Sequence, residues 1–271
     1  MIINPYTLIF LLSFIFFVLG LIIGSFLNVV ICRMNTRRSL GGRSACMSCQ
    51  YKLCWYELIP LFSFLILRGR CRNCKTRISL LYPIVEFTTG IIFFLLFLKF
   101  SAIGGPASGG QDLYFWFNTR FLFIYAYYAV MFSILIVIVF YDLKHKIIPN
   151  SFSLAFGILA FLGLFFFHTL SVWEFLSGIL IATPFYLFWL LSRGKWMGLG
   201  DAKLVLGLGW FLGLSLGFSA IVLAFWIGSV VGISLVFLKK GYGMKSEIPF
   251  APYLVLGTML VFFLDLHLFI I

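Results

Sequence analysis

Long runs of apolar residues alternate with shorter polar segments along almost the whole chain. The runs long enough to cross a bilayer as helices lie roughly at residues 7–31, 80–98, 121–142, 151–168, 172–191, 202–216, 218–238 and 251–270. The sixth run is short and rich in glycine, which lets helices pack closely in a membrane. The pattern predicts an all-α polytopic membrane protein with about eight transmembrane helices.

The polar segments divide the chain into three parts. Residues 1–32 hold the first predicted helix, residues 33–79 form the longest polar loop, and residues 80–271 hold the remaining helices. The first apolar run is too long for the core of a signal peptide, so we expect it to be a retained span. The composition also indicates a membrane protein, since 63% of the residues are hydrophobic and 10% are charged, whereas soluble domains carry about 25% charged residues.

Basic residues are confined to alternate loops. Nearly all of the 20 lysine and arginine residues lie at 33–77, 144–146, 193–203 and 239–245. Because cytoplasmic loops carry an excess of these residues, we expect the basic loops in the cytoplasm and both termini on the other side. The net charge of +12 then reflects topology and contact with anionic membrane lipids. It is spread over several loops, so nucleic-acid binding is not expected.

The longest loop contains two C-x-x-C pairs. Cys46 and Cys49 form the first pair, and Cys71 and Cys74 form the second after 21 intervening residues. Four thiolates at this spacing are typical of a structural zinc site, which has no open position for catalysis. Structural disulfides are rare in the cytoplasm, and a redox dithiol needs only one pair. The loop is therefore predicted to bind a structural zinc ion.

Two of the eight acidic residues lie at the predicted cytoplasmic ends of different helices. Asp142 is found in "FYDLKHKIIPN" and Asp201 in "MGLGDAKL". An ionisable group inside a span is costly, but the cost is smaller at the membrane edge. Depth alone is therefore equally compatible with interfacial acids that pair with Lys144 or Lys203.

The residues around Asp201 favour a chemical role. Gly198 and Gly200 have no side chains, so a peptide backbone can approach this carboxylate closely. Two carboxylates held a few ångströms apart share a proton, and one can act as general base while the other acts as general acid. We therefore regard Asp142 and Asp201 as the candidate catalytic pair of an aspartic protease, with Gly198, Gly200 and Lys203 as supporting residues.

The motif "GLGD" resembles the Gly-x-Gly-Asp signature of intramembrane aspartic proteases. The whole chain resembles the type IV prepilin peptidases, also called prepilin leader peptidase/N-methyltransferases. The similar blocks occur in order along nearly the full length: "GSFLNVVICR" (24–33), the doubled C-x-x-C loop, "ELIPLFSFLILRGRCRNC" (57–74), "ISLLYPIVE" (78–86), "DLKHKIIPN" (142–150), "GLGDAKL" (198–204) and "IPFAPYL" (248–254).

The resemblance implies two activities in the bacterial cytoplasmic membrane. The first is cleavage of the basic leader from prepilins or pseudopilins at the cytoplasmic face, and the second is N-methylation of the new N-terminal residue with S-adenosylmethionine. Carried over to this chain, the catalytic aspartates fall on Asp142 and Asp201, and the zinc ligands on the four cysteines. Simpler archaeal preflagellin peptidases lack the cysteine loop, so its presence favours the bifunctional enzyme over a peptidase alone.

The methyl-donor site has no signature of its own, because the chain has no glycine-rich phosphate loop or Rossmann pattern. Glu86 is the best single candidate, since it is an acid beside the cysteine loop where a cationic amine could bind. Pairing of Glu86 with a loop arginine such as Arg77 explains it equally well.

Two other classes of protein fit the sequence less well. A proton-coupled transporter would need ionisable groups near the bilayer midplane and commonly has internal repeats, and the sequence shows neither. A membrane-anchored zinc-ribbon binding module would explain the cysteines but would leave Asp142 and Asp201 without a role.

Overall fold

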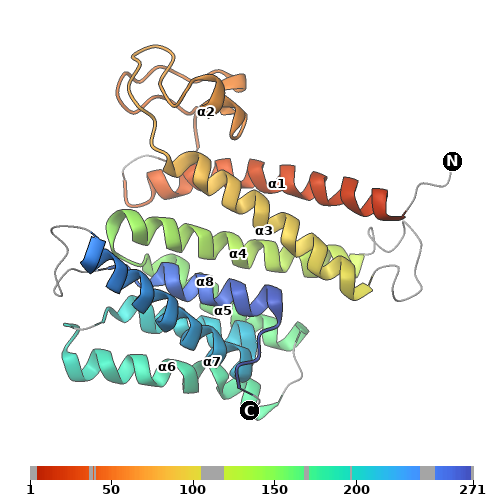
Figure 1. The fold of residues 1–271 in the computed structure, drawn as a ribbon, viewed down its shortest axis with the longest axis vertical. Helices are drawn as coiled ribbons and strands as arrows, with labels where there is room; N and C mark the ends of the chain where they lie inside the picture. Colours follow the sequence, from red (N-terminus) through yellow and green to blue (C-terminus); the bar gives the residue numbers. More distant parts are fainter. Residues whose placement is uncertain are drawn as a thin grey trace. The chain divides into compact units, whose positions relative to one another are not determined.

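The computed structural model describes residues 5–36, 39, 41–104, 119–167, 171–195, 197–238 and 248–269. Within these ranges the regular structure is helical, apart from two isolated β-bridges in the cysteine loop (Figure 1). The prediction of an all-α architecture is confirmed. The chain divides into two compact units, Met1–Val137 and Ile138–Ile271.

The first unit contains helices α1 (Pro5–Arg33) and α3 (Leu81–Gly104) and most of α4 (Thr119–His145). The cysteine loop between α1 and α3 contains two short helical turns, η1 (Trp55–Leu58) and α2 (Phe62–Ile66). Residues 58–68, an apolar run between the two cysteine pairs, are thus folded within the loop, and the run is too short to cross a membrane.

Close backbone contact joins α1 to α3. A Cβ atom on Gly20 would come within 2.8 Å of the Gly90 Cα atom, so the two helices touch where both lack side chains. From α4, the Tyr125 hydroxyl donates to the Phe93 carbonyl at 3.1 Å, and its ring packs 4.5 Å from that of Phe16. These contacts pack α1, α3 and α4 together within the first unit.

The second unit contains the end of α4 together with α5 (Asn150–Phe167), α6 (Val172–Ser192), α7 (Leu199–Leu238) and α8 (Ala251–Leu264). Helix α7 packs against α5, α6 and α8. Its contact with α6 is again made by small residues, since a Cβ atom on Gly209 would lie 2.6 Å from the Gly178 Cα atom. The Ser177 hydroxyl donates to the Gly209 carbonyl at 2.9 Å across the same contact.

Helix α7 is a helical hairpin. Gly213 has a φ of 77° and a ψ of −179°, which breaks the helix in a conformation that favours glycine. A Cβ atom on Gly217 would lie 3.6 Å from the Gly209 Cα atom, although residues eight positions apart in a straight helix are separated by about 12 Å. The predicted runs 202–216 and 218–238 therefore correspond to the two arms of α7, and the reversal occurs at Gly213.

The number and limits of the spans differ from those predicted. Among the described residues, 6 helices are long and apolar enough to cross a membrane: α1, α3, α4, α5, α6 and α7. Helix α8 ends at Leu264, short of the predicted end at residue 270, because Asp265 adopts a left-handed conformation with a φ of 49°. The structure thus confirms a multi-pass helical protein, and eight separate spans stay a prediction.

Candidate functional site

The four cysteines of the two C-x-x-C pairs lie together in the first unit. Their sulfur atoms all lie within 4.8 Å of one another. The Cys46 and Cys74 sulfurs are 3.7 Å apart, and those of Cys49 and Cys71 are 4.0 Å apart. A tetrahedral ion with metal–sulfur bonds of about 2.3 Å separates its ligands by about 3.8 Å. The cluster therefore has the dimensions of a four-sulfur metal site.

The two halves of the cluster have the same backbone geometry. The Gln50 N–H donates to the Cys46 carbonyl, and the Lys75 N–H donates to the Cys71 carbonyl, each at 3.0 Å. Gln50 and Lys75 occupy equivalent positions, and both have a positive φ, 57° and 59°. Each pair is therefore held in a tight turn that aims both of its sulfurs at the same point.

Local hydrogen bonds favour the thiolate form that binds metal. The Thr76 hydroxyl, 3.2 Å from the Cys74 sulfur, and the Thr76 backbone N–H lower the pKa of the Cys74 thiol to about 6. The backbone N–H groups of Cys49 and Ser48 lower the pKa of the Cys46 thiol. The Cys74 thiol is thus poised to act as a metal ligand at neutral pH, and the pKa of the Cys46 thiol is shifted in the same direction.

Asp142 lies near the end of α4, where its side chain is only 4% exposed. The backbone N–H of Ala251, the first residue of α8, forms a hydrogen bond with its carboxylate. The free N–H groups at a helix N-terminus interact favourably with a negative charge. Helix α4 ends just after this residue, since Lys146 adopts a φ of 55° and its N–H donates to the Asp142 carbonyl at 2.7 Å.

Asp201 lies in the first turn of α7 and is half-buried. The backbone N–H of Gly198 forms a hydrogen bond with its carboxylate, and the charge of Asp142 is close enough to act on it. The structure therefore brings the two aspartates together within the second unit, from helices that are far apart in the sequence.

The two glycines before Asp201 have different surroundings. A Cβ atom on Gly200 would come within 2.9 Å of the Ile148 Cβ atom, whereas one on Gly198 would first meet the Asp201 Oδ2 atom, at an ordinary 3.6 Å. Gly200 thus lets the start of α7 pack against the segment after α4. Gly198 is exposed, and because it has no side chain it leaves the Asp201 carboxylate uncovered on that side.

This difference predicts the outcome of a matched pair of substitutions. Gly200→Ala should displace the first turn of α7 and lower the rate of any reaction at Asp201 by up to about 10²-fold, as small misplacements of reacting groups do. Gly198→Ala should cause a smaller loss. The measurement is the initial rate at which each purified variant cleaves a prepilin, the substrate that the sequence resemblance implies. Adding Ile148→Ala to Gly200→Ala should restore activity, and wild-type rates for Gly200→Ala would show that the contact is unimportant.

Lys203 contacts a neighbouring helix of the second unit. Its ammonium group donates to the Asn150 Oδ1 atom at 2.9 Å, which links the first turns of α7 and α5. The observed hydrogen bond of Lys203 is thus to an amide oxygen and does not support the alternative in which Lys203 pairs with an aspartate.

Glu86 lies in the second turn of α3, and its side chain is 9% exposed. Its Oε2 atom accepts a hydrogen bond from the Leu61 N–H at 2.9 Å, and the side chains of Ser25 and Asn28 on α1 also form hydrogen bonds with the carboxylate. These donors are uncharged, and the guanidinium of Arg77 is not among them. The structure therefore places Glu86 in a site formed by α1, α3 and the cysteine loop.

Two backbone donors of these sites have no clear signal in the sequence. Ala251 reaches Asp142 from a distant helix, and "IPFAPYL" gave no reason to expect it. Leu61 has a φ of 59° and a ψ of −50°, and the Phe62 N–H donates to the Pro60 carbonyl at 2.6 Å. This is the rare and strained form of the γ-turn. The strained turn aims the Leu61 N–H at Glu86, and strain of this kind clusters at functional sites.

Comparison with known proteins follows the same division of the chain. Residues 18–100 match the family model of the Bacterial Peptidase A24 N-terminal domain. This part of the chain contains the cysteine cluster and Glu86. Residues 129–233 match the model of the Type IV leader peptidase family. This part of the chain contains Asp142 and Asp201. No solved structure shows significant similarity to the chain.

Three proteins that are similar to most of this chain share the name prepilin leader peptidase/N-methyltransferase. The prepilin leader peptidase/N-methyltransferase of Bacillus subtilis is 30% identical over 255 residues, which cover 92% of each chain. That of Myxococcus xanthus is 34% identical over 85% of this chain and 65% of its own length. That of Vibrio cholerae is 27% identical over 92% of this chain and 95% of its own. With matches of this extent to both halves of the molecule, the chain belongs to the prepilin leader peptidase/N-methyltransferase family.

Proposed function

We propose that this protein cleaves the leader from prepilins or pseudopilins with Asp142 and Asp201 and then methylates the new N-terminal amine. Membership of the family supports both activities. The observation that carries the catalytic assignment is the meeting of the two carboxylates at the ends of α4 and α7. Neighbouring carboxylates of this kind hydrolyse peptide bonds without a metal or a covalent intermediate.

The two aspartates divide the acid–base work between them. The ionised carboxylate takes a proton from the attacking water, and the protonated carboxyl group donates a proton to the peptide carbonyl or to the leaving amine. The absence of a side chain at the exposed Gly198 gives the substrate backbone access to Asp201. This arrangement suits an extended substrate segment, because its backbone must come within hydrogen-bond distance of both carboxylates.

The site belongs to a multi-pass protein of the bacterial inner membrane. We propose eight spans, counting α8 and each arm of α7 as separate crossings, with the basic loops in the cytoplasm and both termini outside. The aspartates then lie at the cytoplasmic edge of the membrane, within residues 80–271. A prepilin can place its apolar stem among the helices while its basic leader stays in the cytoplasm.

The cysteine cluster of residues 33–79 fits a structural zinc ion. The sulfur separations of 3.7 and 4.0 Å match tetrahedral zinc coordination. Four protein ligands leave no open position, so the ion would hold the loop together and would take no part in cleavage. A loop of this size has only a small core, and a metal supplies the missing stability.

Methylation requires a methyl donor, and S-adenosylmethionine is the donor that we propose. Incubating the purified protein with a full-length prepilin tests both activities by mass spectrometry. We expect the leader to be removed with or without S-adenosylmethionine, and one methyl group to be added only in its presence. Cleavage without methylation would identify a peptidase alone. An intact prepilin would remove the support for the whole proposal and favour a transporter.

A further inference from the structure

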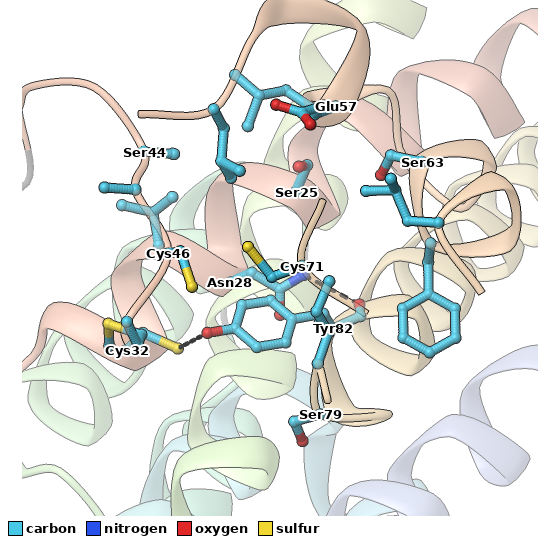
Figure 2. Close-up of a pocket in the computed structure, with 18 of the residues that line it drawn as sticks. Ser25, Asn28, Cys32, Ser44, Cys46, Glu57, Ser63, Cys71, Ser79 and Tyr82 are labelled. Carbon is cyan, nitrogen blue, oxygen red and sulfur yellow. Dashed lines mark hydrogen bonds between the residues drawn. The ribbon is translucent and has the colours of Figure 1, made fainter. Parts of the chain in front are cut away.

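A cavity of about 730 Å³ lies in the first unit, between α1, the cysteine loop and α3 (Figure 2). Its volume falls in the range of about 300–1,000 Å³ that is usual for small-molecule sites. Figure 2 shows Asn28 and Cys32 of α1 beside Tyr82 of α3, with hydrogen bonds from Asn28 to the Tyr82 carbonyl and between Cys32 and the Tyr82 hydroxyl. These two hydrogen bonds therefore link α1 to α3 along this wall of the cavity.

Two buried carboxylates line this cavity. Glu86 is 9% exposed and Glu57 is 6% exposed. The Glu57 Oε2 atom accepts a hydrogen bond from the Cys54 N–H at 2.8 Å, but its Oε1 atom is buried without any hydrogen-bond partner among the described residues. A buried acceptor without a donor destabilises the folded protein. A ligand that supplies a hydroxyl or ammonium group at this wall would remove that destabilisation.

The charges around the cavity favour a ligand that carries both signs. Within the described part of the chain, the hydrogen-bond donors to Glu57 and Glu86 are uncharged. Exposed arginines line the same cavity, namely Arg43, Arg72 and Arg77. Buried carboxylates attract cations, and guanidinium groups bind carboxylates. S-adenosylmethionine has a sulfonium cation, an amino acid carboxylate and two ribose hydroxyls, and therefore matches each of these groups.

We propose that this cavity is the methyl-donor site, in which Glu86 lies beside the sulfonium and the substrate amine and Glu57 accepts from the ribose hydroxyls. The proposal rests on the proposed function, because it assigns a place to the second of its two activities. Carboxylates bind ribose hydroxyls in the same way in dinucleotide sites. The strained turn at Leu61 fixes the position of the Glu86 carboxylate by donating to it.

The chemistry of transfer gives Glu86 a defined task. An α-amine of a peptide is largely cationic at neutral pH, so it must lose one proton before its nitrogen can attack. Glu86 accepts this proton. The nitrogen then forms a bond to the methyl carbon while the bond from sulfur to that carbon breaks, and the electron pair stays on sulfur. The products are a neutral thioether and an N-methylated ammonium ion, so atoms and charge balance.

Direct binding measurements test the assignment on the full-length protein in detergent. We expect Glu86→Gln and Glu57→Gln each to weaken binding of labelled S-adenosylmethionine, measured by equilibrium dialysis, by about tenfold or more, because each removes a charged hydrogen-bond partner. Asp265→Asn, which changes an exposed acid at the end of α8, serves as the control and should bind as the wild type does. Metal content and thermal unfolding establish that each variant is folded.

A second measurement uses the wild-type protein and needs no substitution. Cys32 lines the cavity, whereas Cys54 does not, and both thiols are free and partly exposed. Saturating S-adenosylhomocysteine should block the access of a small alkylating reagent to the Cys32 thiol. Alkylation of Cys32 should therefore be slowed at least about threefold. Alkylation of Cys54 in the same sample should be unchanged.

The outcomes separate this inference from the proposed function. Weakened binding in the glutamine variants together with protection of Cys32 supports the assignment. If the wild-type protein methylates a prepilin but Cys32 is unprotected and the variants bind normally, the donor site lies elsewhere and the proposed function stands. If the wild-type protein neither binds the donor nor transfers a methyl group, the methyltransferase activity itself is absent, and both fail.

Discussion

Asp201→Asn should lower the rate of leader cleavage by about 10²–10⁴-fold, the usual contribution of a general acid or base. Asp142→Asn should cause a loss of similar size. Asparagine keeps the shape of the side chain but neither accepts nor releases a proton under these conditions, so the loss reports on the chemistry. The measurement is the initial rate of prepilin cleavage by purified variants, followed by gel electrophoresis or mass spectrometry.

The double variant should be little worse than either single variant, because groups that act as one unit are not additive. Asp265→Asn provides the matched control: it changes an exposed carboxylate at a left-handed position that asparagine also adopts readily. We expect it to cleave at the wild-type rate. A single aspartate variant that retained half of the wild-type rate would rule out the pair as the catalytic unit.

Cys71→Ser should remove most of the bound metal, because it replaces one of four sulfur ligands in a closed site. Structural zinc binding contributes apparent free energies of about 10–16 kcal/mol to small domains, so the loop should become loose and sensitive to proteolysis. Wild-type protein purified without chelator should contain about one zinc per chain. The loop forms much of the wall of the 730 Å³ cavity, so methylation should fall more than leader cleavage.

Cys54→Ser is the control for this effect. Cys54 belongs to the same loop, but its thiol lies near the Tyr51 hydroxyl and outside the sulfur cluster. The variant should keep its zinc. Wild-type protein without metal, with disulfides among the four cysteines in reducing buffer, would contradict the metal site. Equal loss of both activities in a folded Cys71→Ser variant would contradict the separation of the two sites.

Local patterns in the sequence predicted most of the helices and the clustering of the four cysteines. Apolar length indicates a membrane helix because each helix satisfies its own backbone hydrogen bonds, and two C-x-x-C pairs bring their sulfurs together through short turns. The reversal at Gly213 could not be located, because apolar residues and glycines continue on both sides of it. The end of α8 was missed for a similar reason: "HLFI" remains apolar after the left-handed Asp265.

The parts of the sites that the sequence missed depend on distant backbone groups. The Asp142 carboxylate accepts from the backbone N–H of Ala251, and one of the donors to Glu86 is the backbone N–H of Leu61. A backbone donor is available at almost every residue, so its identity reveals nothing until the chain is folded. The role of Glu57 was also missed, because its burial depends on the packing of η1 in the cysteine loop.

The central claim is that one chain contains two separable sites. An aspartate pair cleaves the prepilin, and a cavity beside the cysteine loop is the site of methylation. The most direct test gives the Asp201→Asn variant two substrates in the presence of S-adenosylmethionine: an intact prepilin and a synthetic peptide with the mature N-terminus. The account predicts that the variant leaves the prepilin uncleaved but methylates the mature peptide. Failure to methylate the mature peptide, by a variant that is folded and retains its metal, would contradict it.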